Sequence, residues 1–133
     1  MACRFFSGLN WSDFMAKKFD ADKSVYDNKC PILYTVEIFS SKWKIPILWY
    51  LTESENNTLR YRELQRKVTG ITETMLTKCL KELEQAKIVN RQQYNTIPPI
   101  VEYSLTKRGK SLIPVLNLMS NWGETQMKLD GVL

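Results

Sequence analysis

The feature that most constrains the fold is a pair of short amphipathic segments, residues 60–68 and 73–86, separated by a break that contains Gly70. Apolar residues recur at helical spacing in the first segment, at Tyr61, Leu64 and Val68. Gly70 suits the positive φ that often follows a helix end, and Thr72 is a typical N-cap residue for the second segment. Two short helices joined by a turn of this length predict a helix-turn-helix.

The second segment predicts a helix with one apolar and one polar face. Leucines dominate the apolar face, with two smaller residues at its edges: Leu76, Leu80 and Leu83, then Cys79 and Thr72. The polar face carries Thr74, Lys78, Lys81 and Gln85, flanked by Thr77 and Glu82. Lysine suits guanine O6 and N7 and phosphates, glutamine suits adenine, and a threonine methyl can meet the thymine methyl. An ordinary surface helix shows the same pattern, so the neighbouring elements decide between the two interpretations.

Two strand patterns follow the helices and predict a β-hairpin, with strands at residues 88–91 and 101–105. In the second strand apolar residues alternate with polar ones, at Val101, Tyr103 and Leu105. The connection is polar and ends in two prolines, which cannot donate to a ladder, so its tip at residues 94–99 should project. Helix, turn, helix and hairpin in this order predict a winged helix, a mainly α fold with a small β-hairpin. A plain hairpin that closes a core is the alternative interpretation.

Two elements are expected before the helix-turn-helix. The spacing of apolar residues predicts a short helix that begins near Pro31. Ser41 offers an N-cap for a second helix over residues 42–53. A very short strand is expected at Thr58 and Leu59.

The last predicted helix, residues 107–127, carries a wide apolar band. Thr106 can cap this helix, and Pro114 should bend it in its second turn. The band is wider than a single small domain readily covers: Leu112, Ile113, Leu116, Met119 and Trp122. We therefore expect a homodimer, with an interface formed by Leu112, Leu116, Met119 and Trp122.

The placement of charge points to a class of partner. The formal net charge is +5, and residues 58–95 hold eight basic and four acidic residues, a net +4. A basic excess concentrated in this stretch favours a polyanion partner such as double-stranded DNA. A solvated helical face is the alternative interpretation of the same charges.

The residue inventory argues against an enzyme. Histidine is absent, which removes the commonest metal ligand and the usual base at neutral pH. The three cysteines, Cys3, Cys30 and Cys79, are too widely spaced for a zinc site, and no glycine-rich phosphate loop occurs. We expect no metal, no cofactor and no catalytic residues.

Composition and hydropathy suggest one domain in the cytoplasm. The chain is 44% apolar, and no apolar run approaches the roughly 18 residues that a membrane span needs. Residues 1–24 are too polar and broken for a secretory signal and form an N-terminal arm that could be helical. We expect residues 25–127 to form the DNA-binding domain, including the dimerisation helix, and residues 128–133 to form a tail.

Several short motifs resemble, in order, those of the HxlR-type transcriptional regulators, a bacterial winged-helix family. They are Cys30-Pro31, Lys42-Trp43, Arg60-Tyr61, Glu63-Leu64, Gly70-Ile71-Thr72, Met75-Leu76, Pro98-Pro99 and Val101-Glu102-Tyr103. The resemblance covers roughly residues 27–122. It implies a homodimer that binds operator DNA, with residues 73–86 in the major groove and the hairpin beside it. It also places Cys30 where some members sense oxidants or electrophiles; a small buried apolar cysteine is the alternative. Ser41 departs from the family, which usually has glycine there.

The leading hypothesis is a dimeric transcription factor on a pseudo-palindromic site, with an oxidant or a small molecule as inducer. Thr74, Thr77, Lys78 and Lys81 are the candidate base readers. The candidate phosphate and wing contacts are Arg60, Arg62, Thr72, Arg91, Gln93 and Lys107. One alternative is a winged-helix module that binds proteins and not DNA. Another is a ligand sensor with a pocket lined by Trp11, Phe14 and Trp122.

Overall fold

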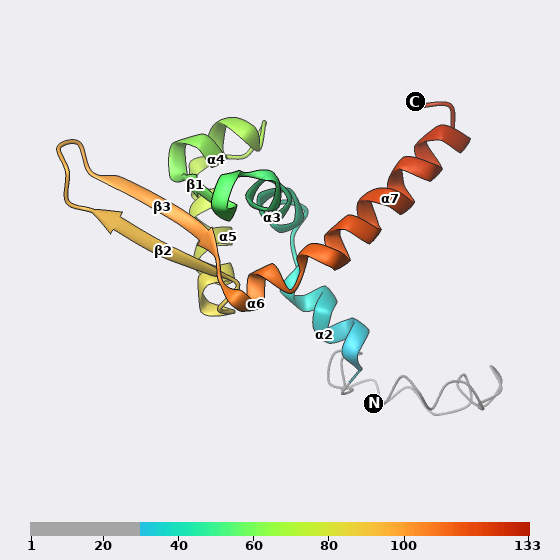
Figure 1. Cartoon of the computed structure of the whole chain (residues 1–133), viewed down its shortest axis with the longest axis horizontal. Coiled ribbons are helices and arrows are strands. Elements are labelled where there is room, and N and C mark those ends of the chain that lie inside the picture. The colour runs from blue at the N-terminus through green and yellow to red at the C-terminus, as the bar shows by residue number, and fades with distance from the viewer. Residues whose placement is uncertain (1–29) are drawn as a thin grey trace. The chain divides into compact units, whose positions relative to one another are not determined.

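The computed structural model describes residues 30–133, and the chain divides into two compact units at a boundary between Ser40 and Ser41. In the first unit the structure describes α2 (Pro31–Ile38), which begins at the proline as predicted. The predicted N-terminal arm, residues 1–24, lies outside the described residues, together with Cys3, Trp11 and Phe14. All other described elements belong to the second unit (Figure 1).

Helix α3 (Lys44–Glu53) begins two residues later than predicted, and Trp43 is its N-cap. Ser41 acts just before the helix, where its Oγ atom accepts a hydrogen bond of 3.1 Å from the Trp43 amide. Ser41 has a φ of 145°, a backbone conformation that glycine adopts at less cost. This backbone angle gives a physical reason for the glycine that the resemblance to the HxlR-type regulators leads us to expect there.

The helix-turn-helix has the predicted form. After a 3-10 turn (Glu55–Asn57) and β1 (Thr58–Arg60), helix α4 (Tyr61–Lys67) and helix α5 (Glu73–Gln85) are joined by a short turn. Gly70 has a φ of +90° in this turn, and the Thr72 Oγ1 atom accepts a 3.2 Å hydrogen bond from the Met75 amide. The two residues thus end one helix and cap the next, as their sequence positions predicted.

The sheet has three strands, the two of the predicted hairpin and the very short strand expected at Thr58 and Leu59, which is β1. Strands β2 (Val89–Tyr94) and β3 (Ile100–Leu105) form a long antiparallel hairpin, and β1 pairs with the other edge of β3, in the order β1-β3-β2. Tyr103 of β3 lies opposite Leu59 of β1 on one side and opposite Arg91 of β2 on the other. Within the second unit the hairpin tip projects beyond the helices (Figure 1).

The predicted C-terminal helix is broken and not bent. Helix α6 (Lys107–Lys110) is capped by Thr106, whose Oγ1 atom accepts from the Gly109 amide at 3.0 Å, and α7 (Ile113–Leu129) starts anew. Pro114 occupies the first turn of α7, where its missing amide proton costs least. A Cβ atom at Gly109 would clash with the Ile88 backbone carbonyl, so only glycine fits this close approach of α6 to the start of β2.

The core of the second unit lies between α3, α4, α5 and the sheet. Its largest fully buried side chains include Ile47, Leu48 and Leu51 of α3, Leu64 of α4, Ile88 and Val89. The leucines of α5 are buried as the sequence predicted: Leu76, Leu80 and Leu83. With its helix-turn-helix and its β2–β3 hairpin, the second unit is a winged helix. Within residues 30–133, no helix combines the length and apolar character needed to cross a bilayer.

Candidate nucleic-acid interface

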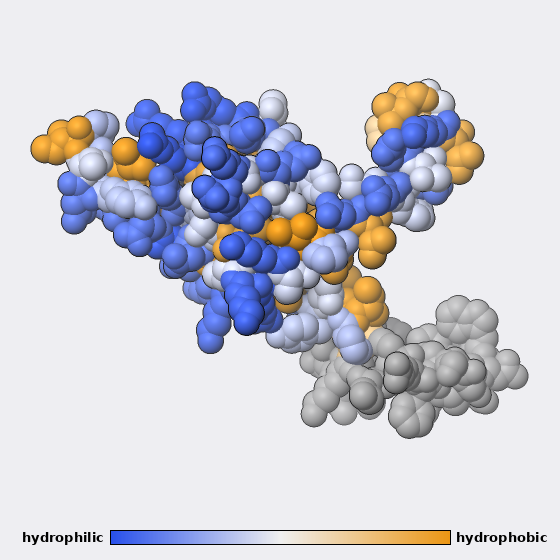
Figure 2. All heavy atoms as spheres, viewed as in Figure 1, coloured by the Kyte–Doolittle hydropathy of each residue, from blue (hydrophilic) through white to orange (hydrophobic). Residues whose placement is uncertain are grey.

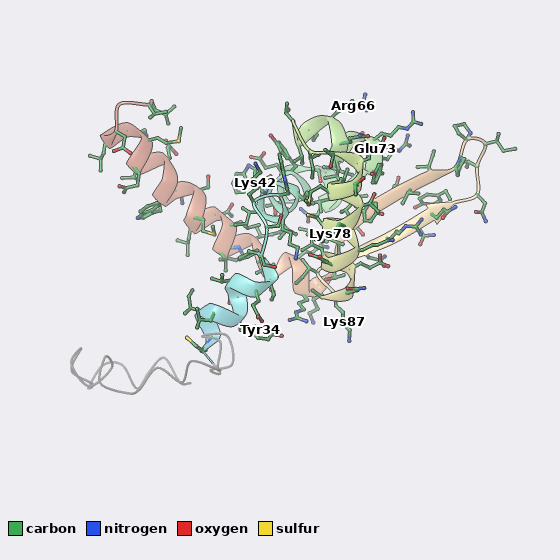
Figure 3. All side chains as sticks on the ribbon, turned by 180° about the vertical axis from the view of Figure 1, so that it is seen from behind. Tyr34, Lys42, Arg66, Glu73, Lys78 and Lys87 are labelled. Carbon is green, nitrogen blue, oxygen red and sulfur yellow. The ribbon has the colours of Figure 1, made fainter. Side chains whose placement is uncertain are left out.

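Helix α5 presents an exposed polar face opposite its buried leucines. Thr74, Lys78, Lys81 and Gln85 are all exposed on this face. Lys78 lies near the middle of the helix, between Glu73 close to one end and Lys87 just beyond the other (Figure 3). The face carries two ammonium groups and no large apolar side chain, so a polar or anionic partner can approach along its length.

On one flank of this face, Thr77 is tied to helix α4. The Tyr61 hydroxyl lies 3.0 Å from Thr77 Oγ1 and donates to the Glu73 carbonyl oxygen at 3.2 Å. Thr77 itself is exposed. Tyr61 therefore connects the first turn of α4 to the first turns of α5 and holds a predicted base reader in place.

On the other flank, Glu82 is tied to helix α3 by an ion pair that the sequence analysis missed. The Lys44 Nζ atom lies 2.7 Å from Glu82 Oε2, and Lys44 is only 5% exposed. The hydrogen bond from Lys44 lowers the pKa of the Glu82 carboxyl; the charges of Lys44 and Lys78 also lower it, against the effect of partial burial. No local pattern around Lys44 predicts its burial, because its partner Glu82 lies 38 residues away in the sequence.

A concave surface that encloses a volume of about 820 Å³ lies between α4, α5 and strand β3. Its charged residues are mostly basic, with five cations, Arg60, Arg62, Arg66, Lys81 and Arg91, against two carboxylates, Glu63 and Glu84. Figure 2 shows hydrophilic residues gathered around α4 and over the body of the hairpin. The concave surface joins the polar face of α5 to the wing, and its excess of cations suits a polyanion.

The predicted phosphate contacts lie on the concave surface, on the wing, at the start of α6 and at the start of α5. Arg60, Arg62 and Arg91 line the concave surface, whereas Lys107 is the exposed first residue of α6 and lies outside that lining. Gln93 shares the wing with Arg91, whose Nη2 atom donates to Gln93 Oε1 at 3.0 Å. Thr72 is the N-cap of α5, where backbone amides of the first turn face outward.

Arg91 also contacts the buried Tyr103 of strand β3. Burial raises the pKa of Tyr103, and the hydrogen bond and positive charge of Arg91 oppose that rise. Arg91, on the edge strand β2, is the register partner of Tyr103, and both residues line the concave surface.

The tip of the wing is less polar than the sequence suggested. Ile97 is completely exposed, and the segment from Asn95 to Pro99 contains no charged residue. Figure 2 shows the same hydrophobic cluster at the far end of the hairpin. The tip can therefore contact a partner by van der Waals packing, while the charges that could hold phosphate lie nearer the base of the wing.

The predicted dimer residues on α7 divide into inner and outer members. Leu116 is buried in the core and Leu112 is half-buried, so both pack within the unit. Met119 and Trp122 are exposed, and Trp122 keeps 69% of its surface. Other apolar residues of α7 that the prediction omitted are also exposed: Val115, Leu118, Met127 and Leu129.

The described part of the chain contains two cysteines, Cys30 and Cys79. Cys30 is half-buried and is the N-cap residue of α2, next to Pro31 as the sequence indicated. Cys79 is buried on α5, with its Sγ atom 3.8 Å from Ser41 Oγ. Among residues 30–133 no three side chains of the metal-binding kinds come together.

Comparison with known proteins gives consistent matches. The chain matches the HxlR-like helix-turn-helix family over residues 38–130. It is 47% identical over 97 residues to a regulatory protein, MalR, of Fusobacterium mortiferum, a match that covers 72% of this chain and 89% of that protein. It is 39% identical over 105 residues to the HTH-type transcriptional regulator YybR of Bacillus subtilis (strain 168), covering 77% and 82% of the two chains. Among solved structures, the reduced form of the redox regulator HypR has a TM-score of 0.70 at 35% identity, covering 78% of this chain and 100% of that one.

Proposed function

Because the chain belongs to the HxlR-like helix-turn-helix family of transcriptional regulators, we propose that it acts as a homodimer on an operator with two half-sites. In this proposal α5 of each protomer enters the major groove, and the β2–β3 wing lies beside it. The half-sites would be separated by about 34 Å, one turn of the duplex, so that both recognition helices reach the same side of the DNA.

The observation that carries the proposal is the polar face of α5 beside a basic concave surface. The buried leucine face fixes which side of the helix points outward, and that side carries Thr74, Lys78 and Lys81. Their side chains have the donors and methyl groups that read base edges. We assign base readout to these three residues and to Thr77.

The cations around the helix would hold the phosphate backbone. Arg60, Arg62 and Arg91 line the concave surface between α4, α5 and the wing, and Gln93 lies next to Arg91 on β2. The first turn of α5, capped by Thr72, offers outward amides to a phosphate. Lys107 would contact DNA only if the duplex extended past the base of the wing.

The exposed apolar face of α7 supports the dimer. Met119, Trp122 and Leu118 lie on one side of the helix, and soluble proteins seldom leave a continuous apolar strip of this kind exposed to water. A second copy of the same helix would cover the strip with an identical surface, as a two-fold dimer requires.

The experiment that tests the proposal is a salt titration of DNA binding by fluorescence anisotropy. If the dimer neutralises roughly eight phosphates, the logarithm of affinity should fall against the logarithm of salt concentration with a slope near −7. Arg62→Ala should make the slope shallower by about 2, one phosphate per protomer, whereas Lys128→Ala, on the polar side of α7, should leave it unchanged. A wild-type slope between about 0 and −2 would remove the electrostatic basis of the proposal.

We also propose that oxidants or electrophiles regulate binding through Cys30. Its place at the N-terminus of α2 favours the thiolate, and the similar protein HypR is described as a redox regulator. Mass spectrometry after mild hypochlorite or quinone treatment should find Cys30 modified and the buried Cys79 intact. An unmodified Cys30, or DNA binding that responds equally in Cys30→Ser, would refute this regulation.

A further inference from the structure

The hydrogen bonds around Tyr61 determine which hydrogen-bonding role is left to Thr77. The Tyr61 hydroxyl makes two contacts, 3.2 Å to the Glu73 carbonyl oxygen and 3.0 Å to Thr77 Oγ1. All three groups lie at the exposed junction of α4 and α5, and both Tyr61 and Thr77 line the concave surface. The two contacts share a single phenolic proton.

Only one arrangement of protons satisfies both contacts. A backbone carbonyl oxygen can only accept, so the Tyr61 proton must point to Glu73. The Tyr61 oxygen can then only accept from Thr77, which places the Thr77 proton on the tyrosine side. The Thr77 hydroxyl has no proton left for a partner in front of α5, but it keeps a free acceptor lone pair.

We propose that Tyr61 makes Thr77 an obligate acceptor, so that Thr77 reads an exocyclic amino group in the major groove. This inference rests on the proposed function and names the chemistry of one base contact within it. In the major groove the amino donors are adenine N6 and cytosine N4, whereas guanine O6, thymine O4 and purine N7 are acceptors that this hydroxyl cannot serve. Thr77 is the reading residue, and Tyr61 is a positioning residue that acts through it.

The first measurement identifies the base pair that Thr77 reads. Duplexes selected from a randomised library by the wild-type protein and by Thr77→Val should share one motif except at one position of each half-site. Valine has the shape of threonine without the hydroxyl, so helix packing is retained while the acceptor is lost. Tyr50→Phe, which removes a tyrosine hydroxyl outside the concave surface, is the matched control and should select the wild-type motif.

The second measurement removes the amino group from that base pair. Replacing adenine by purine, or cytosine by its 4-deamino analogue, should weaken wild-type binding about three- to tenfold, the effect of one hydrogen bond. Thr77→Val should bind both duplexes equally. Tyr61→Phe should lose part of the discrimination, because the Thr77 proton is then no longer held by Tyr61 and the hydroxyl can rotate and donate to an acceptor on a base. Far-UV circular dichroism should show that the three variants remain folded.

The outcomes separate the inference from the proposed function. The acceptor role is refuted if Thr77→Val selects the same motif as the wild-type protein. It is also refuted if the duplex that lacks the amino group binds the wild-type protein as well as the parent duplex does. In either case the regulator proposal stands. If the wild-type protein selects no motif from the library, the proposed function and this inference are both refuted.

Discussion

Removing Glu82 should destabilise the fold far more than removing Lys44, although the two side chains form one ion pair. Lys44 is only 5% exposed, whereas the Glu82 side chain is 38% exposed. Glu82→Ala leaves an ammonium group inside the domain without its carboxylate, a loss that costs about 3–5 kcal/mol where both partners are buried. Because water reaches the Glu82 side of this pair, we expect a cost of about 2–3 kcal/mol.

Lys44→Met should cost only about 0–1 kcal/mol, because methionine fills the buried space and water can hydrate the Glu82 carboxylate. The double variant should match Lys44→Met within about 0.5 kcal/mol, since no buried charge remains to be paired. Urea unfolding at fixed protein concentration, followed by far-UV circular dichroism, measures the three free energies. A cost for Glu82→Ala no greater than that for Lys44→Met would refute the reasoning.

The same pair predicts a pH dependence. The pKa of the Glu82 carboxyl lies below its usual value of 4.5, chiefly because Lys44 donates a hydrogen bond to it. A carboxyl with a lower pKa in the folded state adds stability above its unfolded pKa and loses that contribution as the pH falls through the folded pKa. The stability difference between wild type and Glu82→Ala should therefore be full at neutral pH and shrink below pH 4.5. A difference that stays constant into strong acid would contradict this assignment.

Three further pairs of substitutions test other parts of the structure. Gly109→Ala should lower the free energy of unfolding by about 3 kcal/mol in the same urea assay, because the new Cβ atom would clash with the Ile88 carbonyl. Gly123 lies in an open stretch of α7, so Gly123→Ala should raise the free energy of unfolding by about 0.5–1 kcal/mol. Trp122→Glu should yield monomers in light scattering, while Asn117→Glu on the opposite side of α7 should leave dimers intact. Ser41→Ala and Ser41→Gly both remove the hydroxyl, but Ser41→Gly should be the more stable variant by about 1 kcal/mol, because φ at this position is 145°. Equal melting temperatures of the two variants would contradict this expectation.

The helix-turn-helix could be predicted closely because local rules decide it. Gly70 ends one helix and Thr72 caps the next through contacts within a few residues, and the spacing of Leu76, Leu80 and Leu83 fixes which face of α5 is buried. These features need no knowledge of distant parts of the chain. The outward placement of Thr74, Lys78 and Lys81 follows from them directly.

Features that depend on distant contacts could not be predicted. The periodicity of α7 shows an apolar band, but only the tertiary structure separates buried Leu116 from exposed Trp122. The close approach of Gly109 in α6 to the Ile88 backbone joins residues far apart in the sequence, and no local pattern reveals it. Thr77 was predicted as a base reader, but its tie to Tyr61, 16 residues away, was not.

The most direct test of the account is chemical protection of operator DNA. Dimethyl sulfate methylates guanine N7 in the major groove and adenine N3 in the minor groove, so it distinguishes the two grooves. If α5 of each protomer lies in the major groove, the bound protein should protect guanine N7 in two clusters about 10 base pairs apart. Protection confined to adenine N3, or a single cluster with no partner one turn away, would contradict the placement of two α5 helices in successive major grooves.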